Sequence, residues 1–198
     1  TSSSRTGWAG ACSKKRRTVP RKKPSQNRNS KQSPQQYIAE WMKTFVEQPH
    51  PFLGDLPPCP YAQKARLDGK VRMVWISDKE DDGNIFTHIA NEDFKKIDVL
   101  ILITDRKRWT WRYAYKLRCE LNRTFGKDDK VMLEDHPDYG EKIGRIDMSN
   151  GRYCLMFAQK RSKLNRFSKI LEKTTDYYKN WTKKELEDIV TWRFEDPK

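Results

Sequence analysis

Residues 98–104, DVLILIT, are the stretch that decides the fold of this chain. The five consecutive apolar residues at 99–103 are typical of a strand that is buried on both faces of a sheet. The run is far shorter than the roughly 20 residues needed to cross a bilayer, so it does not predict a membrane span. Three further segments have the apolar, β-branched and aromatic content of strands, and they lie at residues 70–77 (KVRMVWIS), 130–134 (KVMLE) and 152–159 (RYCLMFAQ).

Helical patterns alternate with these strands. Residues 33–36 (SPQQ) combine a serine cap, a proline at the first helical position and a glutamine three residues after the cap. Thr182 and Glu185 form a second capping-box pattern at the start of the last helix. Asp105 is expected to cap a long central helix, and Gly126 is expected to end it. The predicted helices cover residues 34–48, 84–97, 105–125, 162–173 and 182–194, and residues 49–69 are predicted to form a proline-rich loop.

This order of elements defines a fold class. Strands that alternate with helices favour βαβ units, and the two strands near the end of the chain favour an antiparallel pair. We therefore predict an α/β, or α+β, sandwich in which helices pack on a mixed sheet of about four strands. It is expected to form a single domain over residues 37–198, preceded by a disordered basic tail over residues 1–36.

The tail carries most of the positive charge. Ten of the 41 basic residues and none of the 27 acidic ones lie in residues 1–36, which leaves 31 against 27 in the rest of a chain whose formal net charge is +14. So polar a segment does not bury enough apolar surface to offset the entropy of ordering. Clustered cations bind phosphate backbones because each neutralised phosphate releases counterions. We predict binding of nucleic acid or another polyanion, with a targeting signal or a merely solvating tail as alternatives, through Lys14, Lys15, Arg16, Arg17, Arg21, Lys22 and Lys23.

A second basic stretch interleaves cations with aromatic residues at 106–118 (RKRWTWRYAYKLR). Single-strand binders combine charge and stacking in this way, so Arg108, Trp109 and Arg112 are candidate nucleic-acid contacts. On a helix, however, Trp111 and Tyr115 share one face while the cations share another. The ordinary amphipathic interpretation, with aromatic residues in the core, stays open beside the binding interpretation.

Two loops carry candidate catalytic groups. Cys59 opens the sequence CPYA before a strand, and His136 opens HPDY after a later strand. If they met, His136 would raise the thiolate fraction of Cys59, and Asp138 or Asp135 would orient the imidazole. The same groups offer three ligands for a metal ion, although we predict no metal site and no cofactor. Rigid loop corners with a buried thiol are the structural alternative.

The same two loops carry a resemblance. With Lys64, Arg66 and Gly69 after CPYA, and HPDY further on, the chain resembles an uncharacterised bacterial and phage family whose members have a CPFA-type loop before a strand and a later HPDY-type loop. The resemblance covers residues 37–170 discontinuously. It departs at residues 148–153, where MSNGRY replaces the Asn-Arg-Ser-Pro-Tyr-Pro segment of the family. It implies a fold and a site location, and no activity.

Cysteine usage bears on the compartment. The four cysteines are scattered and form neither a disulfide framework nor a metal knuckle, which favours a reducing, intracellular location, with a nucleoid or a virion as possible sites of association. The sequence as a whole predicts a nucleic-acid-associated protein. The alternatives are a small thiol, acid–base or metal-dependent enzyme and a viral accessory or structural protein.

Overall fold

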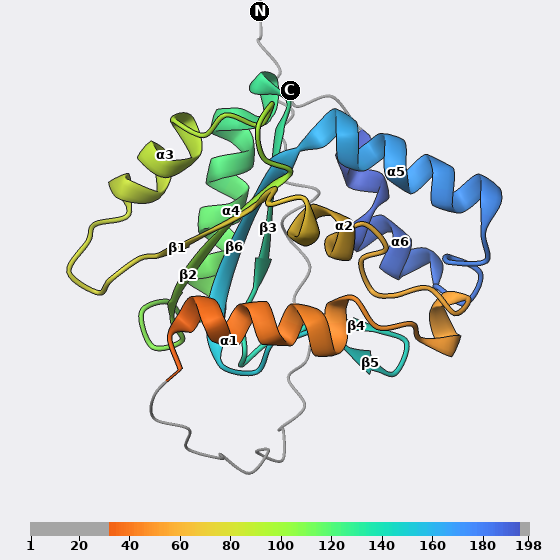
Figure 1. Cartoon of the computed structure of the whole chain (residues 1–198). Coiled ribbons are helices and arrows are strands. Elements are labelled where there is room, and N and C mark those ends of the chain that lie inside the picture. Colours follow the sequence, from red (N-terminus) through yellow and green to blue (C-terminus); the bar gives the residue numbers. More distant parts are fainter. Residues whose placement is uncertain (1–31, 195–198) are drawn as a thin grey trace, which may run out of the picture.

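The computed structural model describes residues 32–194, which form a four-stranded mixed sheet covered by helices (Figure 1). The strand order is β1-β2-β6-β3, with β1 parallel to β2 and with β6 antiparallel to both of its neighbours. The predicted sandwich with about four strands is thereby confirmed. The strands are β1 (Val71–Trp75), β2 (Val99–Asp105), β3 (Lys130–Asp135) and β6 (Tyr153–Lys160).

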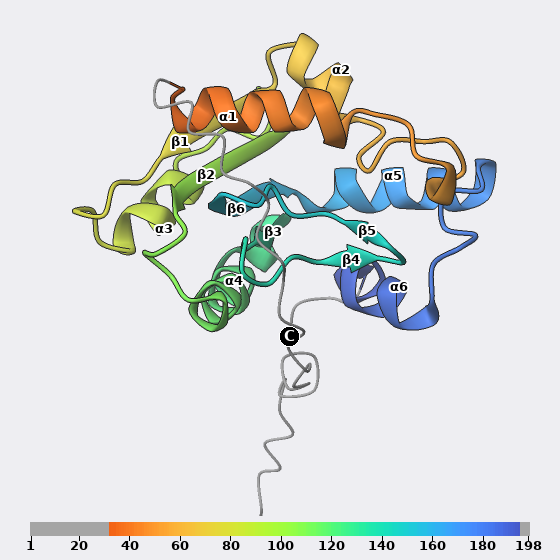
Figure 2. The ribbon, with the colours of Figure 1, turned by 90° about the horizontal axis from the view of Figure 1, so that it is seen from below.

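The two faces of β2 explain why its sequence is apolar throughout. Leu100 and Leu102 point into a cluster shared with α3 (Gly83–Ala90) and α4 (Trp111–Phe125). Ile101 and Ile103 point to the opposite cluster, which α1 (Pro34–Trp41) and α2 (Ala62–Leu67) cover. Figure 2 shows these layers edge-on, with α1 and α2 on one side of the sheet and α3 and α4 on the other. Alternation along a strand therefore makes β2 the centre of both cores.

A third cluster extends the fold beyond one end of the sheet. It lies among α5 (Arg161–Thr174), α6 (Lys183–Ile189) and a small hairpin of β4 (Lys142–Ile143) and β5 (Ile146–Asp147) (Figure 2). The sequence patterns did not predict this hairpin, because two-residue strands leave no periodic signal. The buried members of the cluster are Leu53, Ile143, Ile146, Leu171, Tyr177, Trp181 and Val190.

Several predicted boundaries are wrong in ways that have physical causes. The loop predicted for residues 49–69 contains α2, which buries only Ala62 and Ala65 and is too short to show a helical period. The helix predicted from residue 84 to 97 ends at Ala90. The long helix is capped by Thr110, whose hydroxyl accepts the Tyr113 N–H at 3.2 Å, whereas Asp105 is the last residue of β2.

The starts of the first and last helices lie where the sequence predicted them. Both predicted capping boxes form, at Ser33 with Gln36 and at Thr182 with Glu185. The first helix passes from α1 into a wider turn at Met42–Val46, and the last helix ends at Ile189 before a 3₁₀ turn at Thr191–Phe194. Because α1 begins at Pro34, the last residues assigned to the tail belong to the folded domain.

Candidate nucleic-acid interface

Cys59 lies at the entrance to α2, on the α1 side of the sheet. Its backbone N–H donates to the Val46 carbonyl at 3.1 Å, and its own carbonyl accepts the Ala62 N–H at 3.0 Å. The sulfur packs against the apolar cluster there, and this burial raises the pKa of the Cys59 thiol, with the nearby Glu47 carboxylate raising it further. Glu47 is itself held by two hydrogen bonds from Arg66, at 2.7 and 2.8 Å. The surroundings therefore favour the neutral thiol over the nucleophilic thiolate.

His136 is a buried loop residue that uses both ring nitrogens. Nδ1 accepts the Asp138 N–H at 3.1 Å, so in the neutral ring Nε2 carries the proton and donates to the Trp109 carbonyl at 2.8 Å. The Asp138 carboxylate is exposed and forms an ion pair with Arg106 instead of orienting the imidazole. His50 repeats the arrangement, because its Nδ1 accepts the Phe52 N–H at 3.1 Å. Both His-Pro segments thus act as loop corners.

The candidate catalytic groups Cys59 and His136 lie in different parts of the fold. Cys59 packs on the α1 side of the sheet, whereas His136 bonds to the backbone of Trp109, whose ring belongs to the cluster on the α4 side. Within residues 32–194, no group of three or more His, Cys, Asp or Glu side chains is placed to hold a metal ion. The chemistry predicted for Cys59, His136 and Asp138 therefore stays a prediction, with no assembled site behind it.

Arg108 and Trp109 are used inside the fold. The Arg108 guanidinium donates to the carbonyls of Ser77 and Glu80 and lies 3.1 Å from the Asp82 carboxylate. The Trp109 ring is buried, and its Nε1–H donates to the same carboxylate at 3.3 Å. These contacts fix the acidic turn between β1 and α3, so neither side chain is presented for stacking on a base.

Asp82 is the centre of this cluster. The Tyr113 hydroxyl donates to its second oxygen, and the charged acceptor raises the pKa of Tyr113 to about 12. Three donors, two from the turn before α4 and one from its first turn, therefore meet one carboxylate from the turn before α3. These donors come from 26 to 31 residues further along the chain than Asp82.

Of the three candidate contacts Arg108, Trp109 and Arg112, only Arg112 has an exposed side chain. Its guanidinium lies over the Trp111 ring, 5.3 Å from the centroid. Trp111 in turn stacks on Tyr139 at 4.5 Å between centroids, with 14° between the ring planes. The amphipathic interpretation is right in kind but places the wrong residues in the core, because the buried face of α4 carries Ala114, Leu117, Leu121 and Phe125, whereas Trp111 and Tyr115 are only half-buried. The seven candidate contacts in the tail, Lys14, Lys15, Arg16, Arg17, Arg21, Lys22 and Lys23, lie outside the described residues.

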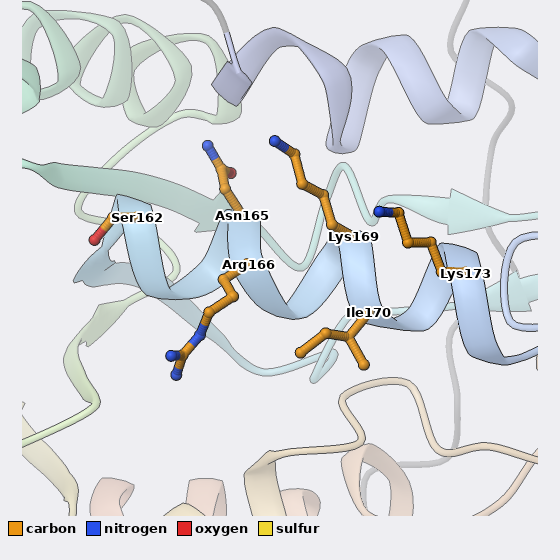
Figure 3. Close-up of a pocket in the computed structure, with 6 residues that line it drawn as sticks. All are labelled: Ser162, Asn165, Arg166, Lys169, Ile170 and Lys173. Atoms are coloured by element: carbon orange, nitrogen blue, oxygen red, sulfur yellow. The ribbon is translucent and has the colours of Figure 1, made fainter.

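An open groove along α5 is the feature that the sequence analysis missed. The volume of this groove is about 360 Å³. Figure 3 shows its residues in two rows along the helix, with Asn165, Lys169 and Lys173 on one side. Ser162, Arg166 and Ile170 form the other row, and each row repeats every four residues as one ridge of a helix does. We call this feature the α5 groove.

The cations of the α5 groove are not neutralised by the folded chain. Among the described residues, no carboxylate lies within 4.0 Å of Arg166, Lys169 or Lys173, whereas Lys163 on another face of the same helix pairs with Asp98. A spacing of three and four residues between basic positions in a predicted helix was the signal that could have revealed this groove.

Cys59 and Cys154 are free thiols. No helix within residues 32–194 is long and apolar enough to span a membrane.

Comparison with known proteins gives no relative. No protein-family model, no curated protein and no solved structure matches the chain. The resemblance to a family with CPFA-type and HPDY-type loops accordingly stays a prediction.

Proposed function

We propose that this protein binds nucleic acid by its phosphate backbone, with the α5 groove as the contact surface of the folded domain and the cationic segment 1–36 as a second contact. The observation that carries the proposal is the exposure of Arg166, Lys169 and Lys173 on one helix face without a carboxylate partner among the described residues. Each phosphate that such a side chain neutralises releases condensed counterions, which is the main source of sequence-independent affinity.

The contrast with other cations of the domain supports this choice. Arg66 is engaged by Glu47, Arg118 lies 2.8 Å from Glu134, and Arg108 is engaged by Asp82. Each of those arginines forms an ion pair with a carboxylate of the same domain. Arg166 and Lys169 lie over the rings of Phe167 and Phe194, at 5.5 and 5.2 Å from the centroids, but the cations of the α5 groove have no carboxylate partner in residues 32–194, so a phosphate would be their first anionic acceptor.

The proposal also defines what kind of binding to expect. Contacts to phosphate fix the position of a protein on nucleic acid without reading the sequence. Binding should therefore be tight at low salt, weak at high salt and indifferent to base order. Such a protein would be found with intracellular nucleic acid, in a nucleoid or a virion.

The test is an affinity measurement on the full chain. Fluorescent single-stranded and duplex oligonucleotides are titrated across a salt series with three variants: a tail variant with the seven candidate cations changed to Gln, a groove variant (Arg166→Gln, Lys169→Gln and Lys173→Gln), and a control variant (Lys116→Gln, Arg123→Gln and Lys127→Gln). The control removes the same charge from exposed positions on and just after α4.

The groove variant should lose affinity and salt dependence more than the control does. For three contacts to a single strand, the slope of log K against log salt should fall by roughly 2, at about 0.7 per phosphate. Equal losses in the groove and control variants would show that only net charge matters, and the α5 groove would then have no special role. Absence of binding by the unmodified chain at low salt would overturn the proposed function altogether.

A further inference from the structure

We infer that the α5 groove takes single-stranded nucleic acid, with a base stacked on Phe194 and the adjoining phosphates held by the cations of the two rows. The inference rests on the proposed function and adds the class of ligand to it. Phe194 ends the 3₁₀ turn Thr191–Phe194 and borders the groove, because the Lys169 ammonium lies 5.2 Å from its ring centroid.

The first argument is the size of the basic surface. Arg166 and Lys173 are seven residues apart on one helix, which corresponds to roughly 10 Å along its axis. A turn of duplex is about 34 Å long. The groove therefore matches a short stretch of one backbone, with Arg166 on one side and two lysines on the other (Figure 3).

The second argument is the apolar surface among the charges. Phe194 is 39% exposed and Ile170 is 44% exposed, which makes them two of the few large apolar side chains left open in the described domain. A duplex keeps its bases stacked inside and offers mainly phosphates and sugars to a basic surface such as this groove. A single strand offers base faces as well, and a charged groove with an aromatic platform is the combination that binds them.

The third argument is the narrow part of α5 that a ligand can reach. On one flank of α5, the Asn165 side chain donates to the Arg193 carbonyl at 2.8 Å. On another flank, Phe167 stacks on Tyr61 with 3.8 Å between ring centroids. Only the outward stripe that lines the groove is left to a ligand.

The experiment compares two probes on the full chain. A fluorescent oligothymidylate and a duplex of the same length are titrated at one moderate salt concentration with Phe194→Ala and with Phe194→Leu, which keeps an apolar side chain but removes the aromatic face. Leu67→Ala is the matched control, because Leu67 is 70% exposed and lies on α2. The unfolding midpoint of each variant shows whether the fold is kept.

We expect both Phe194 variants to bind oligothymidylate about five- to a hundredfold more weakly, the range for loss of one stacked base, and to bind the duplex as before. The control should bind both probes as the unmodified chain does. Equal losses on the two probes, or no loss on the single strand, would overturn the inference.

The two proposals fail differently. If the Phe194 variants have no selective effect while the groove variant (Arg166→Gln, Lys169→Gln and Lys173→Gln) still weakens binding, the nucleic-acid function stands and the single-strand assignment falls. If neither set of variants affects either probe, the α5 groove is not a nucleic-acid site and both proposals for it fall.

Discussion

Asn122 should be among the most costly single residues to replace, because its side chain completes the edge of the sheet. It lies buried on α4, where its amide NH₂ donates to the Met132 carbonyl at 2.9 Å and its oxygen accepts the Met132 N–H at 2.8 Å. Met132 is on β3, an edge strand whose other side pairs with β6. The Asn122 side chain thus satisfies the backbone N–H and carbonyl of Met132, as a further strand paired with this edge would do.

The change Asn122→Ala leaves a buried donor and a buried acceptor without partners. At roughly 1–3 kcal/mol for each unsatisfied group, we expect the free energy of unfolding to fall by about 3 kcal/mol. For a domain of this size that corresponds to a decrease in Tm of roughly 6–12 °C. Urea unfolding followed by tryptophan fluorescence and by circular dichroism measures the change and tests for two-state behaviour.

Two further variants separate hydrogen bonding from packing. Asn122→Leu restores volume but not the hydrogen bonds, so it should remain destabilising. Asn122→Asp keeps the shape but turns a carboxylate oxygen toward the Met132 carbonyl, and it should be at least as harmful as Asn122→Ala. The control Asn91→Ala, at an exposed position after α3, should stay within about 0.5 kcal/mol. An Asn122→Ala protein as stable as that control would refute the reasoning.

Two other predictions concern titrating groups. Burial raises the pKa of the Cys59 and Cys154 thiols, so both should react with iodoacetamide only slowly at neutral pH in the native protein and rapidly in denaturant. Mass spectrometry of the labelled peptides measures the two rates. Rapid labelling of Cys59 in the native protein would support the thiol-enzyme hypothesis instead. Tyr113 should ionise near pH 12, and Asp82→Asn should lower that pKa, as seen by absorbance titration against Tyr113→Phe. Since the folded pKa lies above the unfolded value of 10, this contact stabilises the fold fully below pH 10 and ceases to do so as the pH rises toward 12; an unchanged tyrosine titration in Asp82→Asn would contradict the assignment.

The elements of the fold were largely predictable because local signals are strong where burial is continuous or caps are explicit. The run at 99–103 is typical of a strand buried on both faces, and the capping boxes at residues 33–36 and 182–185 marked two helix starts. The signals failed where an element is short. The helix α2 and the β4–β5 hairpin are stabilised by neighbours distant in sequence, and no period of theirs is long enough to read.

The site was harder to predict, because a residue type does not say which partners it will meet. Arg108 and Trp109 have the composition of a binding surface, yet Asp82 and two backbone carbonyls engage them. Cys59 and His136 have the composition of a catalytic pair, yet they lie in different surroundings. No sequence pattern predicted Arg166 and Lys169 as binding residues, although they are among the cations that the fold leaves exposed.

By itself, the sequence determined the class of fold, the alternation of helices and strands, and the concentration of charge in residues 1–36. Those properties follow from side-chain periodicity, local capping and composition, which act over a few residues. Only the tertiary structure decided which charges are neutralised and which are free, since an ion pair such as Arg66–Glu47 joins residues 19 positions apart. The function proposed for the α5 groove depends on which charges the fold leaves unpaired, and pairing is a property of distance in space.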